Sequence, residues 1–178
     1  FDDAWCSPGN LAFNDFSNNV VVHDLINEQT ECGTAFGFGG FGGTIQNVTI
    51  DTAGDHVHNS ACTNTDSDSD GDFGAWADGI TLVGSGHQII DNTIINPSDI
   101  GIVHFGGQET IIANNTIIIT ERNYGAFGAI ALHPWIEADA SGVQITGNTI
   151  NSEGDSTCGG LHLGINIGAH LWNWGCVE

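Results

Sequence analysis

The amino-acid sequence predicts an all-β solenoid, and three observations support this fold class. A short sequence motif recurs along the chain as IIDNTII (89–95), IIANNTI (111–117) and VQITGNTI (143–150). Apolar residues alternate with small or polar ones between Gly, Asn, Asp and Pro, which is typical of short strands joined by tight turns. No segment has the length and the 3.6-residue period of an ordinary helix.

The spacing of the repeats predicts the size of each coil. The last Ile of the three copies falls at positions 94, 117 and 150, and weaker copies end at Ile26 and Ile50. These positions indicate a period of about 22 to 24 residues, with an insertion of about ten residues after Ile117. Leucine-rich repeats share this period, but they would need columns of Leu and a helical half. Isoleucine columns instead favour a stacked β-solenoid.

One further strand is expected after each copy of the motif, and these strands form a second set. Its members are expected within residues 34–40, 78–84, 100–107, 128–134 and 160–168. Interruptions of the rhythm at 51–77, and later at 120–128 and 134–142, are expected to form loops, where binding usually resides.

The motif itself predicts two core positions and a bend. Ile89 and Ile94 are expected to point into the coil. Asn92 is expected to stack with Asn115 and Asn148 at a bend, where amides can bond along the stack and tolerate turn geometry.

With these motifs the chain resembles the right-handed parallel β-helix superfamily, often called pectin-lyase-like, whose coils carry an I-x-x-N-T-I signature. The segment DGITLVGSGHQIIDNTIINPSDIGIVHFGG (78–107) is similar to β-helix repeat proteins of unassigned function. The resemblance covers about residues 20–168 and implies a solenoid of about five to six coils with loop insertions. Because this fold hosts lyases, hydrolases, epimerases, adhesins and inert fibres, the resemblance does not specify a chemistry.

The expected organisation has three parts. Residues 1–19 form an N-terminal cap or lead-in, and residues 20–170 form the β-helix with a loop insertion near 51–77. Residues 171–178 form a C-terminal cap segment. The chain begins at Phe1 and contains no Met, so we interpret it as a processed piece of a longer protein.

The charge balance limits the partners. Twenty-two acids face a single basic residue, Arg122, which gives a net charge of -21. Binding to nucleic acid or to an anionic membrane needs Lys and Arg, so neither is expected. A lone Arg also argues against a pectate-type lyase, which would need a cationic cleft. No apolar run approaches the roughly 18 residues of a membrane span. Cations, neutral glycans or other protein copies are the expected partners.

The five cysteines favour an extracellular or cell-surface location, because disulfides persist in oxidising compartments. Two disulfides and one odd thiol, with Cys62 as the fifth cysteine, are the simplest account. The sequence does not set the pairing, but the nearest neighbours at the two ends are Cys6 with Cys32 and Cys158 with Cys176.

An acidic run suggests a calcium loop. Asp66, Asp68, Asp70 and Asp72 alternate around Gly71, as the oxygen ligands of calcium loops do. The run departs from an EF-hand at its twelfth position, where Ala77 replaces the expected bidentate carboxylate. A solvated acidic loop is the alternative.

Four residues at the ends of the second set of strands are candidate catalytic groups, if the protein is an enzyme. They are Asp78, Asp99, His104 and His133. Two carboxylates could act as acid and base in glycoside hydrolysis, and a His, or Tyr124, could transfer a proton. The alternative is ordinary turn chemistry, in which Asp precedes Gly.

Two functional hypotheses follow from these patterns. The first is a non-catalytic extracellular β-helix, namely a filament, sheath or adhesin subunit that self-associates or binds other extracellular proteins and is stabilised by calcium. The second is a carbohydrate-active domain, resembling a glycoside hydrolase, lyase or epimerase, that acts on an extracellular polysaccharide.

Overall fold

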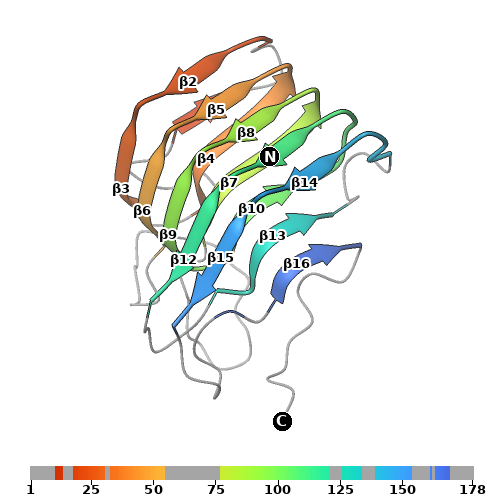
Figure 1. Ribbon diagram of the computed structural model, residues 1–178. Helices are drawn as coiled ribbons and strands as arrows, with labels where there is room; N and C mark the ends of the chain where they lie inside the picture. Colours follow the sequence, from red (N-terminus) through yellow and green to blue (C-terminus); the bar gives the residue numbers. More distant parts are fainter. Residues whose placement is uncertain are drawn as a thin grey trace, which may run out of the picture.

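The strands wind into a solenoid in the computed structural model of the protein (Figure 1). The structure describes residues 11–13, 18–30, 33–54, 77–120, 126–133, 139–153, 161 and 163–168. Within these ranges there is no helix, and every pair of neighbouring strands is parallel. The all-β parallel β-helix predicted from the repeats is therefore confirmed.

The chain visits three sheets in a fixed cycle, one strand in each sheet per coil. Sheet A contains β1 (Leu11–Phe13), β4 (Gly33–Phe41), β7 (Ala77–Ser85), β10 (Ile100–His104), β13 (Gly128–Leu132) and β16 (Leu163–Ile167). Sheet B contains β2 (Val21–His23), β5 (Thr44–Gln46), β8 (Gln88–Ile90), β11 (Ile111–Ala113) and β14 (Gln144–Thr146). Sheet C contains β3 (Ile26–Thr30), β6 (Thr49–Ala53), β9 (Thr93–Pro97), β12 (Thr116–Ile119) and β15 (Thr149–Ser152).

Five coils are complete, and β16 begins a sixth. In Figure 1 the strands of sheet B run on into those of sheet C across one side of the solenoid, and sheet A lies on the other side. Strand β1 pairs with β4, so the first coil of sheet A begins within residues 11–13.

Isoleucine columns fill the centre of the solenoid. Ile45, Ile89 and Ile112 are partners in sheet B, and Ile50, Ile94 and Ile117 are partners in sheet C. Each is at most 1% exposed. Partners in adjacent strands lie about 4.8 Å apart, so β-branched side chains in one column pack directly on one another. The expected core positions of Ile89 and Ile94 are confirmed.

Each coil bends sharply between sheets B and C. The residue at the bend adopts a left-handed backbone conformation, with φ between 54° and 65°, in Asp24, Asn47, Asp91, Asn114 and Gly147. Asn, Asp and Gly are the residues that tolerate this conformation at least cost. Backbone geometry therefore favours Asp, Asn or Gly at the first of the two residues before the sheet C strand in each coil.

In the third to fifth coils the residue after the bend is Asn, and these side chains form a ladder of amides along the solenoid. Asn92 Nδ2 donates to Asn115 Oδ1 at 2.9 Å, and Asn115 Nδ2 donates to Asn148 Oδ1 at 3.0 Å. The backbone N–H groups of Asn92 and Asn115 donate to the same oxygens of the following coil, at 3.0 and 2.9 Å. The predicted stacking of these three side chains is confirmed, and Leu25 and Val48 hold the corresponding positions in the first two coils.

The pleat of sheet A is interrupted at one position in each of β4, β7, β10 and β13. Ala35 and Phe36 both belong to the central core, as do Ala129 and Ile130. In β7 and β10, the two strands between β4 and β13, the corresponding residues are Gly79 and Gly101. A Cβ added to Gly79 would meet Ile94, and one added to Gly101 would meet Ile117, so these glycines also face inward. Two successive residues thus face the core, and the residues on either side are turned to the outer face.

Candidate functional site

The outer face of sheet A is where the structure places the candidate carboxylates. Asp78 precedes the inward pair Gly79 and Ile80 in β7, and its side chain bonds to Thr81, which follows that pair. Because Ile80 faces the core, Thr81 and Asp78 face outward. Asp78 is nevertheless only 8% exposed, so this carboxyl lies in a buried polar setting.

A chain of hydroxyl groups surrounds Asp78. Asp78 Oδ2 lies 2.8 Å from Thr81 Oγ1, which lies 2.9 Å from Thr34 Oγ1, which lies 3.1 Å from the carbonyl oxygen of Phe36. A Thr hydroxyl has one hydrogen to donate. Thr81 Oγ1 donates to Asp78 Oδ2, and Thr34 Oγ1 donates to the carbonyl oxygen of Phe36, so both hydroxyl hydrogens have an acceptor.

The electrostatics of the site disfavour the ionised form of Asp78. Burial raises the pKa of this carboxyl well above its ordinary value, and the nearby Asp99 carboxylate raises it further. Hydrogen bonds from Thr81 and from the Ile100 N–H, which lies 3.1 Å from Oδ1, oppose the shift without cancelling it. The structure therefore brings together Asp78, a buried carboxyl with a raised pKa, and Asp99, a half-buried carboxyl.

His104 lies on the other side of the sheet. It follows Val103 of the outer face, is 0% exposed, and its ring lies 6.4 Å from that of His87 inside the coil. The Nε2–H donates to the carbonyl oxygen of Gly84 at 3.2 Å, and the buried Nδ1 has no hydrogen-bond partner. Burial lowers the pKa of His104 to about 4, and His87 contributes to the shift. His104 is thus a neutral core residue, turned away from Asp78.

His133 follows β13 at the opposite end of sheet A from Asp78. Its ring contacts Phe105 edge to face, with centroids 5.9 Å apart. Phe105 belongs to a second apolar cluster, distinct from the central core, with Val83, Ile100, Val103, Phe127 and Ala131. This cluster occupies the outer face of sheet A between the two ends, so the structure brings Asp78 and Asp99 together but not the two histidines with them.

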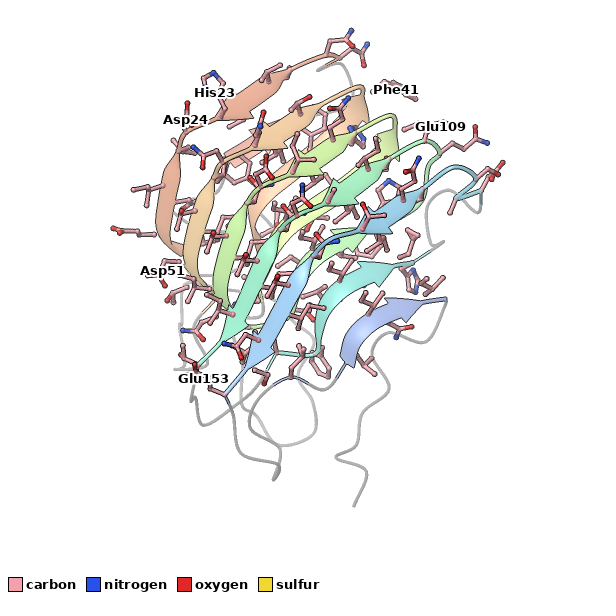
Figure 2. The ribbon with its side chains drawn as sticks, viewed as in Figure 1. His23, Asp24, Phe41, Asp51, Glu109 and Glu153 are labelled. Carbon is pink, nitrogen blue, oxygen red and sulfur yellow. The ribbon has the colours of Figure 1, made fainter. Side chains whose placement is uncertain are left out.

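A second polar site was not anticipated from the sequence. His23, Asp24, Gln46, Asn47 and Asp91 line an open surface depression of about 350 Å³ on the bend of the first three coils. His23 Nδ1 lies 2.8 Å from Asp24 Oδ2, and Gln46 Nε2 donates to Asp91 at 3.3 Å. Figure 2 shows His23 and Asp24 side by side at this bend. The recurrence of Asp or Asn before the ladder position was the signal that could have located it.

Several predicted site residues lie outside the described residues. They are the calcium candidates Asp66, Asp68, Asp70 and Asp72, the cysteines at positions 6, 32, 62, 158 and 176, and Tyr124. Within the described ranges, no group of three or more His, Cys, Asp or Glu side chains is placed to hold a metal ion. No helix in these ranges is long and apolar enough to cross a membrane.

The fold and the two polar sites define a parallel β-helix protein with short coils. Comparison of the chain with protein-family models, with curated proteins and with solved structures gave no match. Any functional assignment therefore depends on the geometry of this chain.

Proposed function

We propose that the chain is an extracellular structural β-helix of the pectin-lyase-like superfamily, and that it serves as a filament, sheath or adhesin subunit that associates end to end. The I-x-x-N-T-I coils and the amide ladder support the superfamily assignment. The cysteines support the extracellular location, and the acidic run at 66–72 supports stabilisation by calcium.

The open C-terminal end of the described solenoid carries the proposal of end-to-end association. Ile165 and Ile167 of β16 pair with Ile130 and Leu132, so they continue the columns of sheet A. Yet they are 51% and 74% exposed. An edge strand with exposed apolar side chains is a template for another strand. A second copy shifted along the axis would meet this edge with parallel strands of its own.

Electron microscopy of the assembled protein tests this function. The expected particle is a filament one solenoid wide, with copies repeating along its axis. Substitution of Ile165 and Ile167 by Asp should shorten or abolish the filaments while leaving a folded monomer, as judged by circular dichroism. Monomeric wild-type particles at every protein concentration would refute the proposal.

A carbohydrate-active domain is the second candidate, and the Asp78–Asp99 pair favours it. Glycosidases use a carboxyl with a raised pKa as the acid and a second carboxyl as base or nucleophile, and Asp78 has a raised pKa with Asp99 nearby. Screening the wild type and Asp78→Asn against a panel of neutral polysaccharides tests this candidate. Cleavage by the wild type that is lost in the variant would establish it, whereas a panel left intact by both would exclude it.

A further inference from the structure

We propose that Asn47 and Asn114 carry N-linked glycans, which stand in a row along the bend between sheets B and C. The inference rests on the extracellular location in the proposed function, and it adds a covalent modification to that role. Both residues lie outside the amide ladder formed by Asn92, Asn115 and Asn148, so a sugar on either leaves the ladder intact.

The sequence contains two triplets that can accept a glycan. The transfer requires Asn-x-Thr or Asn-x-Ser, in which x is not Pro. The triplets NVT (47–49) and NNT (114–116) meet this requirement, whereas NPS (96–98) has Pro at the excluded position. The Asn-Thr-Ile of the repeated motif does not meet it, because Thr follows Asn directly.

Both glycan acceptors occupy the bend, which turns their side chains to solvent. Asn47 and Asn114 are exposed, and their φ angles of 54° and 56° are those of the bend. The next residue of each triplet faces the core, since Val48 is 1% and Asn115 is 0% exposed. The Thr that follows begins a sheet C strand and faces outward. The amide and the hydroxyl of each triplet are thus reachable from the outer side.

The structure leaves space beside each acceptor amide. A Cβ added to Gly147, the bend residue of the fifth coil, would lie 2.4 Å from Asn114 Oδ1. Because Gly has no side chain, the Asn114 amide is uncovered on that side. Asn47 lines the open depression of about 350 Å³ described above. The His, Asp and Gln side chains of this depression can form hydrogen bonds with the hydroxyl groups of a first sugar.

The glycan acceptors alternate with bend residues that have no side-chain amide. The bend residue is Asp24 in the first coil, Asp91 in the third and Gly147 in the fifth, and Figure 2 shows Asp24 at the edge of the solenoid. Coils repeat at about 4.8 Å, so the two glycans would be attached about 10 Å apart and would not crowd one another. Neither acceptor lies in the first or fifth coil, whose edges meet the next copy in the proposed filament.

The transfer forms one bond and breaks one. The donor is an activated sugar, namely the glycosyl diphosphate of a lipid, and a separate transferase catalyses the step. The acceptor Nδ2 attacks the anomeric carbon of the sugar and releases one proton to solvent. The bond from that carbon to the phosphate oxygen breaks, and the diphosphate leaves with its electron pair. The linked amide keeps one hydrogen, with which Asn47 can still donate to Asp24 Oδ1 as it does in the unmodified protein.

Mass spectrometry of the full chain, collected from the medium of the cells that produce it naturally, tests the proposal. The wild type should exceed the mass of the bare chain, with sugar on Asn47 and Asn114 and none on Asn96. Asn47→Gly and Asn114→Gly should each lose one glycan and keep the other. Gly is the matched replacement, because Gly147 already adopts the bend conformation.

Further variants separate the triplet from its place in the coil. Thr116→Val retains Asn114 but should lose its glycan, whereas Thr93→Val, at the register partner of Thr116, should lose none. Asp91→Asn completes a triplet with Thr93 at an exposed bend. Added to the double variant that lacks both natural acceptors, it should restore one glycan, at position 91. Circular dichroism verifies that each variant folds.

A bare Asn47 or Asn114 in wild-type protein from the medium would overturn this inference alone. Sugar that maps to Thr49 or Thr116, or a glycan that persists in Thr116→Val, would do the same. An Asp91→Asn variant that stays bare would refute the bend as the position that accepts the glycan. A bare chain found only inside the cells would overturn the extracellular location in the proposed function as well.

Discussion

Asp78 and His104 are buried titratable residues of neighbouring strands, and burial favours the neutral form of both. Burial raises the pKa of the Asp78 carboxyl and lowers that of the His104 imidazole, since it disfavours the charged form of each. The hydrogen bond from Thr81 opposes the shift at Asp78, whereas the buried Nδ1 of His104 has no hydrogen-bond partner. Each residue makes stability depend on pH, with opposite signs.

His104 should make the protein less stable in mild acid. Its folded pKa of about 4 lies below the ordinary value of 6.5, so the unfolded chain binds the proton more tightly. Stability is therefore lost as pH falls from about 6.5 to about 4, by about 3 kcal/mol in total. His104→Gln keeps a donor and cannot titrate. The difference in melting temperature between wild type and His104→Gln should shrink over this range, and a constant difference would contradict the assignment.

Asp78→Asn should show the reverse. The raised pKa of Asp78 means that the folded state holds the proton more tightly, so wild-type stability declines as pH rises above about 3.9, the ordinary value of the unfolded chain. The amide keeps the contacts with Thr81 and Ile100 without ionising. The variant should therefore melt above the wild type at pH 7 and together with it near pH 3.5. A lower melting temperature at pH 7 would mean that Asp78 is ionised.

At the scale of the elements, the amide ladder connects coils through side chains as well as backbone. Asn115 is 0% exposed, donates to the carbonyl oxygen of Ile89 at 2.8 Å and to Asn148, and accepts from Asn92. Removing it leaves several buried groups without partners, which is costly even where the replacement fits.

Asn115→Val should destabilise the fold by about 2–4 kcal/mol, because it leaves the backbone N–H and the side-chain amide of Asn92 without their hydrogen-bond acceptor. Val is accommodated sterically, since Val48 occupies the same position in the second coil. Urea unfolding measures the loss. The control is Asn114→Gly at the exposed bend, where Gly147 already serves in the next coil. A loss below about 0.5 kcal/mol in Asn115→Val would show that the ladder is energetically minor.

Gly79→Ala tests the interruption of the pleat in sheet A. An added Cβ would lie 2.5 Å from the carbonyl oxygen of Gly101, so the backbone must shift, at a cost of about 1–3 kcal/mol. Gly164 occupies the corresponding register position in β16 and has open space around it. Gly164→Ala should therefore be neutral or slightly stabilising in urea unfolding. Equal effects at the two positions would refute the steric explanation.

The two element-scale features differ in how far the sequence predicted them. The ladder and the core isoleucines were predictable because each repeats a residue type at a period near 23. The interruption at Ala35, Gly79, Gly101 and Ala129 was not, because a small residue before an apolar one is ordinary in a regularly alternating strand. The interruption matters for the site. His104 and Asp78 were grouped because both lie at the ends of strands in the second set, whereas the double inward step and the following alternation put them on opposite sides of sheet A.

At the scale of the whole molecule, acidity should make the fold depend on salt. A net charge of -21 with one basic residue repels itself in the compact state. Salt shortens the screening distance from about 10 Å at 0.1 M to about 3 Å at 1 M. The melting temperature should therefore rise with NaCl and equally with KCl.

A variant that replaces Glu28, Glu109 and Glu153 with Gln serves as the control for the salt effect. These carboxylates are exposed, so their removal should reduce the dependence on salt without disturbing the core. A melting temperature that is unaffected by salt, or an equal dependence in this variant, would contradict self-repulsion as the cause.

The amide ladder also has a consequence for the use of this chain as a scaffold in protein engineering. Asn92 and Asn115 are 23 residues apart, and Asn115 and Asn148 are 33 apart, yet the two amide contacts differ by only 0.1 Å. Ten additional residues in one coil have therefore not disturbed the stack at all. A foreign peptide could be grafted between β13 and β14 and displayed at a fixed height on a rigid column, with the amide contacts as an internal gauge that the coils remain aligned.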